Sequence, residues 1–319
     1  ILRGVYHSDN DRAVAHAVGG HINTAVHTAS FLLDTVALTH RLAGSPAVRA
    51  TSALAHGMRG MSIPDFRQAF LCGSTPVPVP EKQGKEKVVY FPSCAVRSMG
   101  YTTEEGRRAE PLMDVTLRLL EKAGYEVIIP QKVNSLCCGK AYDTKGLKEE
   151  AGETAARLGK ALLEASGDGS FPVLCDTSPC LGFMKKKLDQ RLKLYEPVEF
   201  ALSFLADRLK FTQKHQCVAI HPTCSTRSMG LAGKMKQVAE LCSARVVMPE
   251  GIFCCGFSGD KGFTHPELNA AALAELAGQI SGCDAGYSSS RTCEIGLSVH
   301  GGKPYRNILY LIDECSEAK

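Results

Sequence analysis

The sequence lacks the features that mark membrane-spanning, nucleic-acid-binding and secreted proteins. Its 319 residues carry a formal net charge of only +4 at pH 7, and no basic stripe with interleaved aromatic residues runs along the chain, so no nucleic-acid partner is expected. The most apolar stretch, residues 25–42, contains Asp34 and Arg41, whereas a transmembrane helix needs about 20 largely uncharged residues. No signal peptide opens the chain. We therefore expect no transmembrane segment, and peripheral membrane association is the form of membrane contact left open.

Cysteine, by contrast, is abundant, with 14 residues. Four of them form two adjacent pairs, Cys137-Cys138 and Cys254-Cys255. Adjacent cysteines rarely bond to each other, because disulfide geometry needs a larger Cα separation than that backbone comfortably gives. In a chain of this length the pattern favours metal or cluster ligation over a disulfide framework. The expected compartment is therefore reducing.

The first 84 residues predict a helical connector followed by a linker. Residues 11–70 are rich in Ala, Val, Leu and His and are expected to be helical, with breaks near Gly19-Gly20 and Gly44-Pro46. Six histidines fall within or just before this region, and no two of them have the i, i+4 spacing of paired ligands on a helix. They are interpreted as packed or surface residues. The alternating prolines of residues 73–80 and the charged residues 81–87 then predict an extended, semi-rigid spacer.

The rest of the chain contains an internal repeat. Residues 88–100 and 218–230 both read as a buried strand, a Pro-Ser/Thr-Cys turn and Arg-Ser-Met-Gly. In each copy a helix, a second strand, a Cys-Cys-Gly motif and another helix are predicted to follow in that order. Strands that alternate with helices in this way predict an α/β fold with mainly parallel sheets flanked by helices. We therefore predict two pseudo-symmetric modules, residues 85–213 and 214–319, preceded by the α-helical connector and linker of residues 1–84.

Each copy places cysteines at corresponding points, just after predicted strands or at strand–helix turns. Open α/β folds have their ligand sites there, and a helix N-terminus directs N–H groups towards a negatively charged cluster. The metal-ligand candidates are Cys94, Cys137, Cys138, Cys175 and Cys180 in the first copy and Cys224, Cys254, Cys255 and Cys293 in the second. Four thiolates per copy is the number that a [4Fe–4S] cluster needs from its protein. Zinc also accepts four cysteines, but structural zinc sites usually show two close C-x2-C pairs, so two [4Fe–4S] clusters are favoured and zinc in one site is the alternative.

Several further residues near the motifs have two interpretations. Arg97 and Arg227 either balance the negative charge of cluster thiolates or form structural ion pairs. His221, three residues before Cys224, is interpreted as a packed strand histidine, with approach to a cluster as the alternative. The remaining cysteines are interpreted as small buried hydrophobic residues; they are Cys72, Cys217, Cys242, Cys283 and Cys315.

The repeated modules resemble the CCG domains of heterodisulfide reductase, of the glycolate oxidase iron–sulfur subunit and of the anaerobic glycerol-3-phosphate dehydrogenase small subunit. The chain resembles more specifically the C-terminal half of the large FAD and iron–sulfur D-lactate dehydrogenases. Three stretches carry this closer resemblance: FPSCAVRSMG at 91–100, GIFCCGFSGDKGFTHPELN at 251–269 and SSSRTCEIGLSVHGGKPYRNILYLIDE at 288–314. The helical segment before the linker also resembles the connector of that family, so the resemblance covers essentially the whole chain.

This resemblance implies an oxidoreductase in which a 2-hydroxy acid of the D-lactate type is oxidised at FAD. Electrons then leave through iron–sulfur clusters to a quinone or cytochrome acceptor. The chain itself has no C-x2-C-x2-C-x3-C ferredoxin run and no convincing flavin-binding segment, so no catalytic residue is assigned within it. Because the chain opens at Ile1 without an initiator methionine, we expect a fragment, a processed product or the ordered part of a longer polypeptide. FAD and the ferredoxin-containing region are expected upstream or on a partner subunit, in the cytoplasm or mitochondrial matrix, with peripheral association at the inner membrane as an alternative.

The sequence departs from the fullest CCG pattern at one point. That pattern ends in C-x2-C and provides five cysteines for a noncubane cluster, but Thr177 and Ser290 occupy the first position of the pair here. Cys175 is the substitute in the first copy, and the second has only Cys283, ten residues before Cys293. This weakens the alternative of a disulfide-reducing module like heterodisulfide reductase. A zinc-stabilised interaction scaffold is the non-redox alternative.

Overall fold

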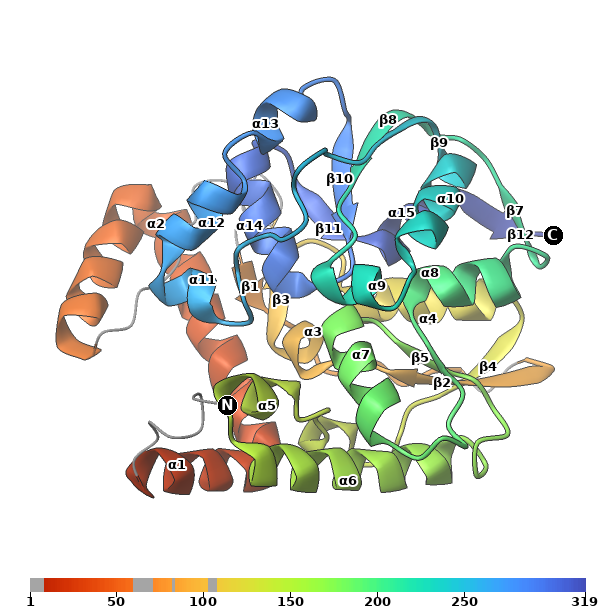
Figure 1. The fold of residues 1–319 in the computed structure, drawn as a ribbon, viewed down its shortest axis with the longest axis horizontal. Helices are drawn as coiled ribbons and strands as arrows, with labels where there is room; N and C mark the ends of the chain where they lie inside the picture. The colour runs from red at the N-terminus through yellow and green to blue at the C-terminus, as the bar shows by residue number, and fades with distance from the viewer. Residues whose placement is uncertain (1–8, 60–70, 82–83, 103–107) are drawn as a thin grey trace.

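Two four-stranded parallel sheets with the same strand order form the centre of the molecule (Figure 1). The computed structural model describes residues 9–59, 71–81, 84–102 and 108–319. The first sheet has the order β4 (Tyr125–Ile128), β2 (Glu86–Phe91), β5 (Val173–Cys175) and β6 (Leu194–Tyr195). The second has the corresponding order β9 (Ser243–Val247), β8 (His215–Ile220), β10 (Ala285–Ser288) and β11 (Tyr305–Asn307). All neighbouring strands in both sheets are parallel, so the predicted α/β fold with a repeated module is confirmed.

The central strands explain why the repeat folds twice in the same way. The last four residues of β2 and the last four of β8 are buried. Continuous apolar runs of this kind are typical of parallel strands that have helices on both faces. The strand β2 begins at Glu86, inside the segment that the charge pattern assigned to the linker, because pairing of Glu86 with Tyr125 extends the sheet beyond the apolar run.

Helices cover both faces of each sheet, as Figure 1 shows. In the first module they are α3 (Cys94–Ser98), α4 (Leu112–Lys122), α5 (Lys140–Lys145), α6 (Lys148–Ala165), α7 (Ser178–Lys187) and α8 (Pro197–Phe200), which continues into a π-helical turn at Ala201–Leu205. In the second they are α9 (Cys224–Ser228), α10 (Ala232–Cys242), α11 (Lys261–Thr264), α12 (Pro266–Ala272), α13 (Leu276–Gln279), α14 (Arg291–Gly301) and α15 (Ile308–Glu314). The single helix after the second motif is thus divided into α12 and α13.

The two modules share one hydrophobic core. Helices α4 and α8 of the first module pack against α15 and α10 of the second. Fully buried side chains from all four helices meet there, among them Leu119, Phe200, Met235 and Ile312. The antiparallel pair β7 (Leu209–Phe211) and β12 (Ser316–Ala318) brings the last described strand back to the segment between the modules. The two sheets are therefore held in a fixed mutual arrangement by a large apolar interface.

The N-terminal helices pack on the first module. Helix α1 (Asp9–Gly20) lies beside α6 (Figure 1), where Arg157 Nη2 donates to the carbonyl of Gly19 at 2.8 Å. Helix α2 (Ile22–Arg59) contains a break at Gly44, whose φ is 72°. Both breaks expected in this region are therefore present, while residues 60–70 lie outside the described part. A short antiparallel pair, β1 (Leu71–Gly73) with β3 (Met99–Tyr101), joins this region to the first module.

The histidines of the N-terminal region are mostly on the surface. His16, His21 and His27 are exposed and His40 is half-buried, whereas His7 and the side chain of His56 lie outside the described part. Within the described helices, none combines the length and hydrophobicity that crossing a bilayer requires.

Candidate metal centres

Four thiols of the first module meet at the carboxyl end of its sheet; we call Cys94, Cys137, Cys138 and Cys180 the first thiol set. Cys94 opens α3 directly after β2, and Cys180 is the third residue of α7, just after β5. The adjacent pair lies in the loop between a 3-10 turn, Val133–Ser135, and α5. The Sγ atoms of Cys94 and Cys137 are 3.8 Å apart, and Cys138 interacts with Cys137 and Cys180.

The second module brings four thiols together in the same way; Cys224, Cys254, Cys255 and Cys293 are the second thiol set. Cys224 opens α9 after β8, and Cys293 is the third residue of α14 after β10. The Cys255 thiol donates to Cys293 Sγ at 2.8 Å, and Cys254 interacts with Cys224 and Cys255. Eight of the nine predicted ligands thus fall into two corresponding groups of four.

Hydroxyl side chains position the first cysteine of each set. Ser93 is the N-cap of α3, and its Oγ accepts the N–H of Val96 at 3.3 Å. Thr223 caps α9 and accepts the N–H of Thr226 at 3.0 Å. Such caps satisfy N–H groups that the helix cannot pair internally. The repeated Pro-Ser/Thr-Cys sequence is therefore a strand ending followed by a capped helix that begins at the cysteine.

The glycine of each Cys-Cys-Gly motif turns the chain so that backbone N–H groups face the sulfurs. Gly139 and Gly256 have φ values of 88° and 73°, a region that other residues rarely adopt. The Gly256 N–H donates to Cys254 Sγ at 3.4 Å, and the Lys140 N–H donates to Cys138 Sγ at 3.4 Å. Concave groups of backbone N–H donors of this kind favour bound anions, so the motif stabilises thiolates.

The two corresponding arginines of the repeat tie the first cysteine segment to the paired cysteines. Arg97 is buried, and its guanidinium donates to the carbonyls of Pro92 and Leu136, the residue before Cys137. Arg227 lies over the ring of Phe253, the residue before Cys254, with 5.2 Å between its guanidinium carbon and the ring centroid. Arg97 also favours the charged form of Cys94. Among the described residues no carboxylate forms an ion pair with Arg97.

The thiols within each set compete for negative charge. A hydrogen bond with Cys137, together with burial, raises the pKa of the Cys94 thiol. Hydrogen bonds with Cys254 and Cys293, again with burial, raise the pKa of Cys255, while those from Cys224 and Cys255 lower the pKa of Cys254. Closely spaced thiols cannot all ionise without a compensating cation. A bound metal centre would remove this conflict, because metal ligation requires thiolates.

Thr177 and Ser290 stand where the fullest CCG pattern has a fifth cysteine, and both side chains are buried. Thr177 Oγ1 is 2.8 Å from Ser93 Oγ and donates to Asp176 at 2.9 Å. Ser290 is the buried N-cap of α14. Cys175 ends β5 fully buried, and its thiol donates to the Thr177 carbonyl at 3.7 Å. It lies near enough to Cys138 for the two to interact, but it is the one candidate outside the two groups of four.

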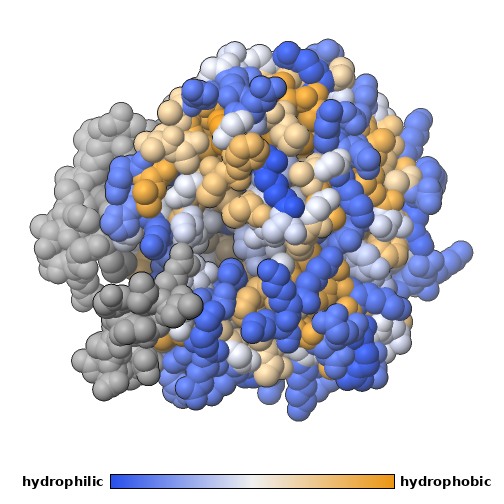
Figure 2. All heavy atoms as spheres, in the orientation of Figure 1, coloured by the Kyte–Doolittle hydropathy of each residue, from blue (hydrophilic) through white to orange (hydrophobic). Residues whose placement is uncertain are grey.

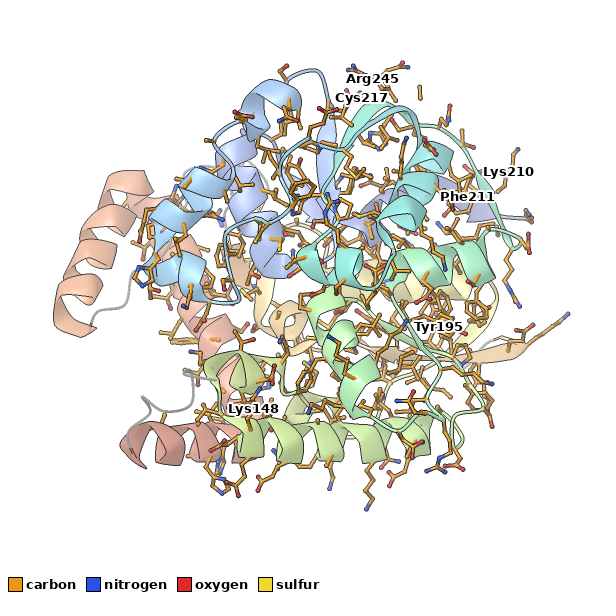
Figure 3. All side chains as sticks on the ribbon, viewed as in Figure 1. Lys148, Tyr195, Lys210, Phe211, Cys217 and Arg245 are labelled. Atoms are coloured by element: carbon orange, nitrogen blue, oxygen red, sulfur yellow. The ribbon has the colours of Figure 1, made fainter. Side chains whose placement is uncertain are left out.

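The five cysteines interpreted as buried hydrophobic residues are all buried, as predicted. Two of them form a close pair, with Cys217 Sγ 2.9 Å from Cys283 Sγ. Cys217 lies in the first half of β8 (Figure 3), whereas Cys224 follows the other end of that strand. Cys242 interacts with Cys315 in the shared core. All 14 cysteines lie in the described part of the chain, and all are free thiols.

The thiol sets supply the donor atoms of a metal or iron–sulfur centre. In the described ranges, no three His, Cys, Asp or Glu side chains are arranged to hold one metal ion. The 3.8 Å separation of Cys94 and Cys137 Sγ matches the edge, about 3.8 Å, of a tetrahedron with Zn–S bonds of about 2.3 Å, but the 2.8 Å separation of Cys255 and Cys293 is shorter. Each set supplies four soft donors, backbone N–H groups and a nearby arginine, which is the donor chemistry that iron–sulfur clusters use.

The two thiol sets differ in exposure. In the first set Cys94 is half-buried and the other three thiols are buried. In the second set Cys224 and Cys254 are exposed. Phe253, next to Cys254, is 64% exposed. The second set therefore opens to solvent, whereas the first is largely enclosed.

Helices α7 and α9 are in contact and bring the two sets close together. Gly182 of α7, two residues after Cys180, lies against Ser225 of α9 and against Met229, the residue after α9. Across the same interface the Ser178 N–H donates to the Ser289 carbonyl at 3.0 Å, and Asn307 Nδ2 donates to the Asp176 carbonyl at 3.1 Å.

Sequence reasoning missed the buried carboxyl groups at this interface. Asp176 accepts hydrogen bonds from the Ser93 N–H and the Tyr90 hydroxyl. Glu294 pairs with buried Arg291 at 3.0 Å. Burial raises the pKa of Asp176, of Glu196 and of Glu294. For Asp176 the available signal was the polar run before Cys180, which reads equally well as a surface turn.

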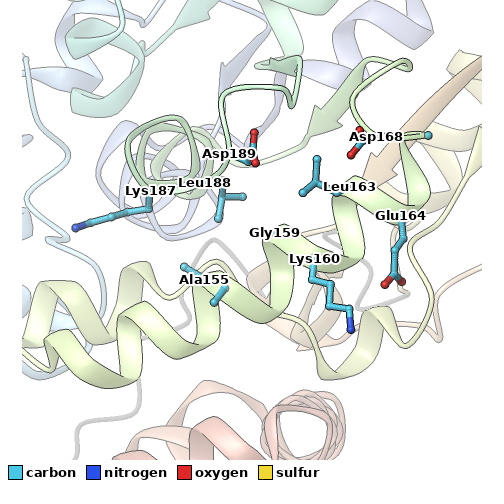
Figure 4. Close-up of a pocket in the computed structure, with 11 residues that line it drawn as sticks. Ala155, Gly159, Lys160, Leu163, Glu164, Asp168, Lys187, Leu188 and Asp189 are labelled. Atoms are coloured by element: carbon cyan, nitrogen blue, oxygen red, sulfur yellow. The ribbon is translucent and has the colours of Figure 1, made fainter.

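A groove lies between α6 and the end of α7 (Figure 4) and has a volume of about 660 Å³. Small and charged side chains line it, including Gly159, Lys160, Glu164 and Asp189. On the face shown in Figure 2, hydrophobic and hydrophilic residues are interspersed. Neither feature adds a group to the thiol sets.

The family model of the cysteine-rich domain CCG matches the chain twice, at residues 88–185 and 218–297. These segments make up more than half of the chain and contain both thiol sets. The chain therefore belongs to the CCG cysteine-rich domain family, and the predicted duplication of this domain is confirmed.

The chain is also similar to curated proteins named lactate utilization protein A. It is 25% identical over 237 residues to the protein of Geobacillus kaustophilus, covering 69% of this chain and 95% of that protein. It is 26% identical over 190 residues to the protein of Oceanobacillus iheyensis, covering 54% and 75%. Among solved structures, an aspartate racemase homologue from Pyrococcus horikoshii matches over 72% of this chain and 96% of its own, with 15% identity and a TM-score of 0.28, which is too low to support an argument.

Proposed function

We propose that this protein is an iron–sulfur electron carrier in lactate utilisation. The observation that carries the proposal is the pair of four-thiol sets, repeated at the carboxyl ends of two parallel sheets and joined by the contact of α7 with α9. Iron–sulfur clusters supply one-electron transfer when bound. Similarity to proteins named lactate utilization protein A supports the metabolic setting.

The residues of each set have separate roles in this proposal. The thiolates of the two sets hold one [4Fe–4S] cluster each, and Cys175 is a spare thiol beside the first. The Cys-Cys-Gly backbone donors and Arg97 offset the negative charge of the thiolates. The enclosed first set receives electrons and the exposed second set passes them on, because close approach of an acceptor needs an accessible site.

We further propose that the electrons come from FAD, where a 2-hydroxy acid of the D-lactate type is oxidised. The flavin and a ferredoxin-containing region would belong to another part of the same protein or to a partner subunit, and the acceptor would be a quinone or cytochrome. Residues 1–84 would act as the connector, residues 85–213 and 214–319 as the two electron-transfer modules. The cytoplasm or the mitochondrial matrix is the proposed location, because both are reducing.

Anaerobic purification or reconstitution of the full chain tests the proposal. We expect about eight iron and eight sulfide per chain, as two [4Fe–4S] clusters require, and EPR signals from two interacting centres after reduction with dithionite. A folded chain that binds neither iron nor sulfide would overturn the proposal. Zinc in both sets would identify a structural scaffold instead, and its removal by chelation would then unfold the modules.

The lactate assignment needs a separate measurement. In the complete protein or complex that contains the flavin, D-lactate should reduce the clusters of this chain under anaerobic conditions. Glycolate and L-lactate serve as matched substrates. If none of these acids reduces the clusters in a complex whose clusters respond to dithionite, the assignment to 2-hydroxy acid oxidation is rejected. The proposed electron-carrier role would still stand.

A further inference from the structure

His221 is a fully buried imidazole whose ring has no hydrogen-bond partner among the described residues. It directly follows β8, and its side chain is 1% exposed. Its backbone is fully used, because the N–H donates to the Tyr287 carbonyl at 2.8 Å and the carbonyl accepts from Ser288 Oγ at 2.9 Å. Neither Nδ1 nor Nε2 is bonded. Buried polar groups are almost always satisfied, and an imidazole always carries at least one N–H.

His221 lies at the end of β8, three residues before Cys224, the first cysteine of the second thiol set. It interacts electrostatically with Cys254, and Cys254 in turn with it. The other charged group acting on the ring is the guanidinium of Arg227 on α9, which offers donors only. Of these two groups only Cys254 has an acceptor atom, so the second thiol set offers the unpartnered ring a sulfur acceptor.

We propose that His221 donates an N–H hydrogen bond to the cluster held by the second thiol set, at Cys254 Sγ or at an adjacent sulfide. This inference rests on the proposed function. Hydrogen bonds to the sulfurs are among the factors that set the reduction potential of an iron–sulfur cluster. The added electron increases the negative charge of the centre, so an N–H donor stabilises the reduced state and raises the potential. His221 transfers no proton and remains a positioning residue.

The first module provides an internal comparison at the same place. Phe91 ends β2, three residues before Cys94, and is fully buried. It pairs with Cys175 in the sheet, as His221 lies beside Ser288. Phenylalanine has no N–H to donate. We therefore infer that the two clusters are unequal and that the second, at the more exposed site, has the higher potential of the two.

Redox titration of the full chain, monitored by EPR, tests this inference after iron and sulfide have been counted. His221→Leu fills the buried position with an apolar side chain and removes the ring N–H. His221→Gln replaces the ring N–H with an amide N–H. We expect His221→Leu to shift one of two midpoint potentials to a more negative value with unchanged iron content, and His221→Gln to recover part of that shift. Phe91→Leu is the matched control and should leave the potential of the second cluster unchanged.

Phe91→His provides an independent test in the first module, because it should shift the other potential to a more positive value. A His221→Leu chain with full iron content and two unaltered potentials would overturn the inference. Loss of half the iron in both His221→Leu and His221→Gln would also overturn it, because His221 would then be a ligand or a structural residue. A wild-type chain without iron would reject the proposed function itself, which keeps the two failures distinct.

Discussion

Gly139 lies so close to helix α6 that a β-carbon on it would be 2.5 Å from the carbonyl oxygen of Ala151. Gly256 has the same relationship to α12, where the nearest atom would be the carbonyl oxygen of Leu268 at 2.5 Å. Both glycines also have positive φ. The third residue of the Cys-Cys-Gly motif is therefore required for two reasons, the turn itself and the backbone that packs against it.

We expect Gly139→Ala and Gly256→Ala each to lower the free energy of unfolding by about 1–3 kcal/mol, because a left-handed conformation and a backbone clash are combined. Each variant should also bind less iron, since the N–H donors of the turn move away from the sulfurs. Urea unfolding and iron analysis measure both effects.

Gly152 in α6 is the matched control for the glycine variants. A β-carbon there would meet no atom within 4 Å, and Gly→Ala inside a helix stabilises by about 0.5–1 kcal/mol. Gly152→Ala should therefore leave the iron content unchanged and raise stability. Equal effects of Gly139→Ala and Gly152→Ala would argue against the packing explanation.

Iron content of Cys→Ala variants should distinguish the eight thiols of the two sets from the other cysteines. We expect Cys138→Ala or Cys255→Ala to lose about half of the iron, because each removes one of the four thiolates that a [4Fe–4S] cluster needs. Cys217→Ala is the control, since Cys217 is equally buried but lies away from both sets. A Cys255→Ala chain that retains all its iron would show that the second set is not the ligand set.

Cys175 has a different expected outcome. Its thiol is fully buried and donates to the Thr177 carbonyl, so we expect Cys175→Ala to keep about eight iron per chain. Cys175→Ala should lower the free energy of unfolding by about 1 kcal/mol, because it leaves a small cavity. Loss of half the iron, as expected for Cys180→Ala, would instead make Cys175 a ligand of the first centre.

Glu196 should make stability depend on pH. Its buried carboxylate accepts from Ser178 Oγ and from the Val198 N–H, both at 2.8 Å, and burial raises its pKa above the ordinary value of 4.5. The folded protein therefore keeps the Glu196 carboxyl group protonated to a higher pH than the unfolded chain does. The contribution of Glu196 to stability is greatest below pH 4.5 and declines as the pH rises through the raised folded-state pKa.

Glu196→Gln removes the charge and keeps one acceptor oxygen for the Val198 N–H, while its amide N–H can donate to Ser178 Oγ in place of the bond that the carboxylate accepts. The difference in free energy of unfolding between Glu196→Gln and the wild type should grow in favour of the variant as the pH is raised from 4.5. Urea unfolding at a series of pH values measures it. Two curves that stay parallel across this range would contradict the raised pKa.

Local sequence accounts for a large part of this protein. The alternation of apolar strands and helices predicts the two parallel sheets, because these patterns depend on residues that are near each other in the chain. The strands β5 and β10 were not predicted, since they are three and four residues long and merge into polar turns. They are strands because β2 and β8 provide a neighbour to pair with, which no local pattern reports.

The sequence by itself determined which chemical groups are available: thiols in two corresponding sets, a glycine after each adjacent pair, and an arginine three residues after each first cysteine. Only the tertiary structure decided which groups meet. It brought Cys94 to Cys137 and left Cys217 beside Cys283. It also buried the ring of His221, which interacts with Cys254, without a hydrogen-bond partner among the described residues. These relationships arise from sheet pairing and helix packing between residues far apart in the chain, so spacing alone could not distinguish them.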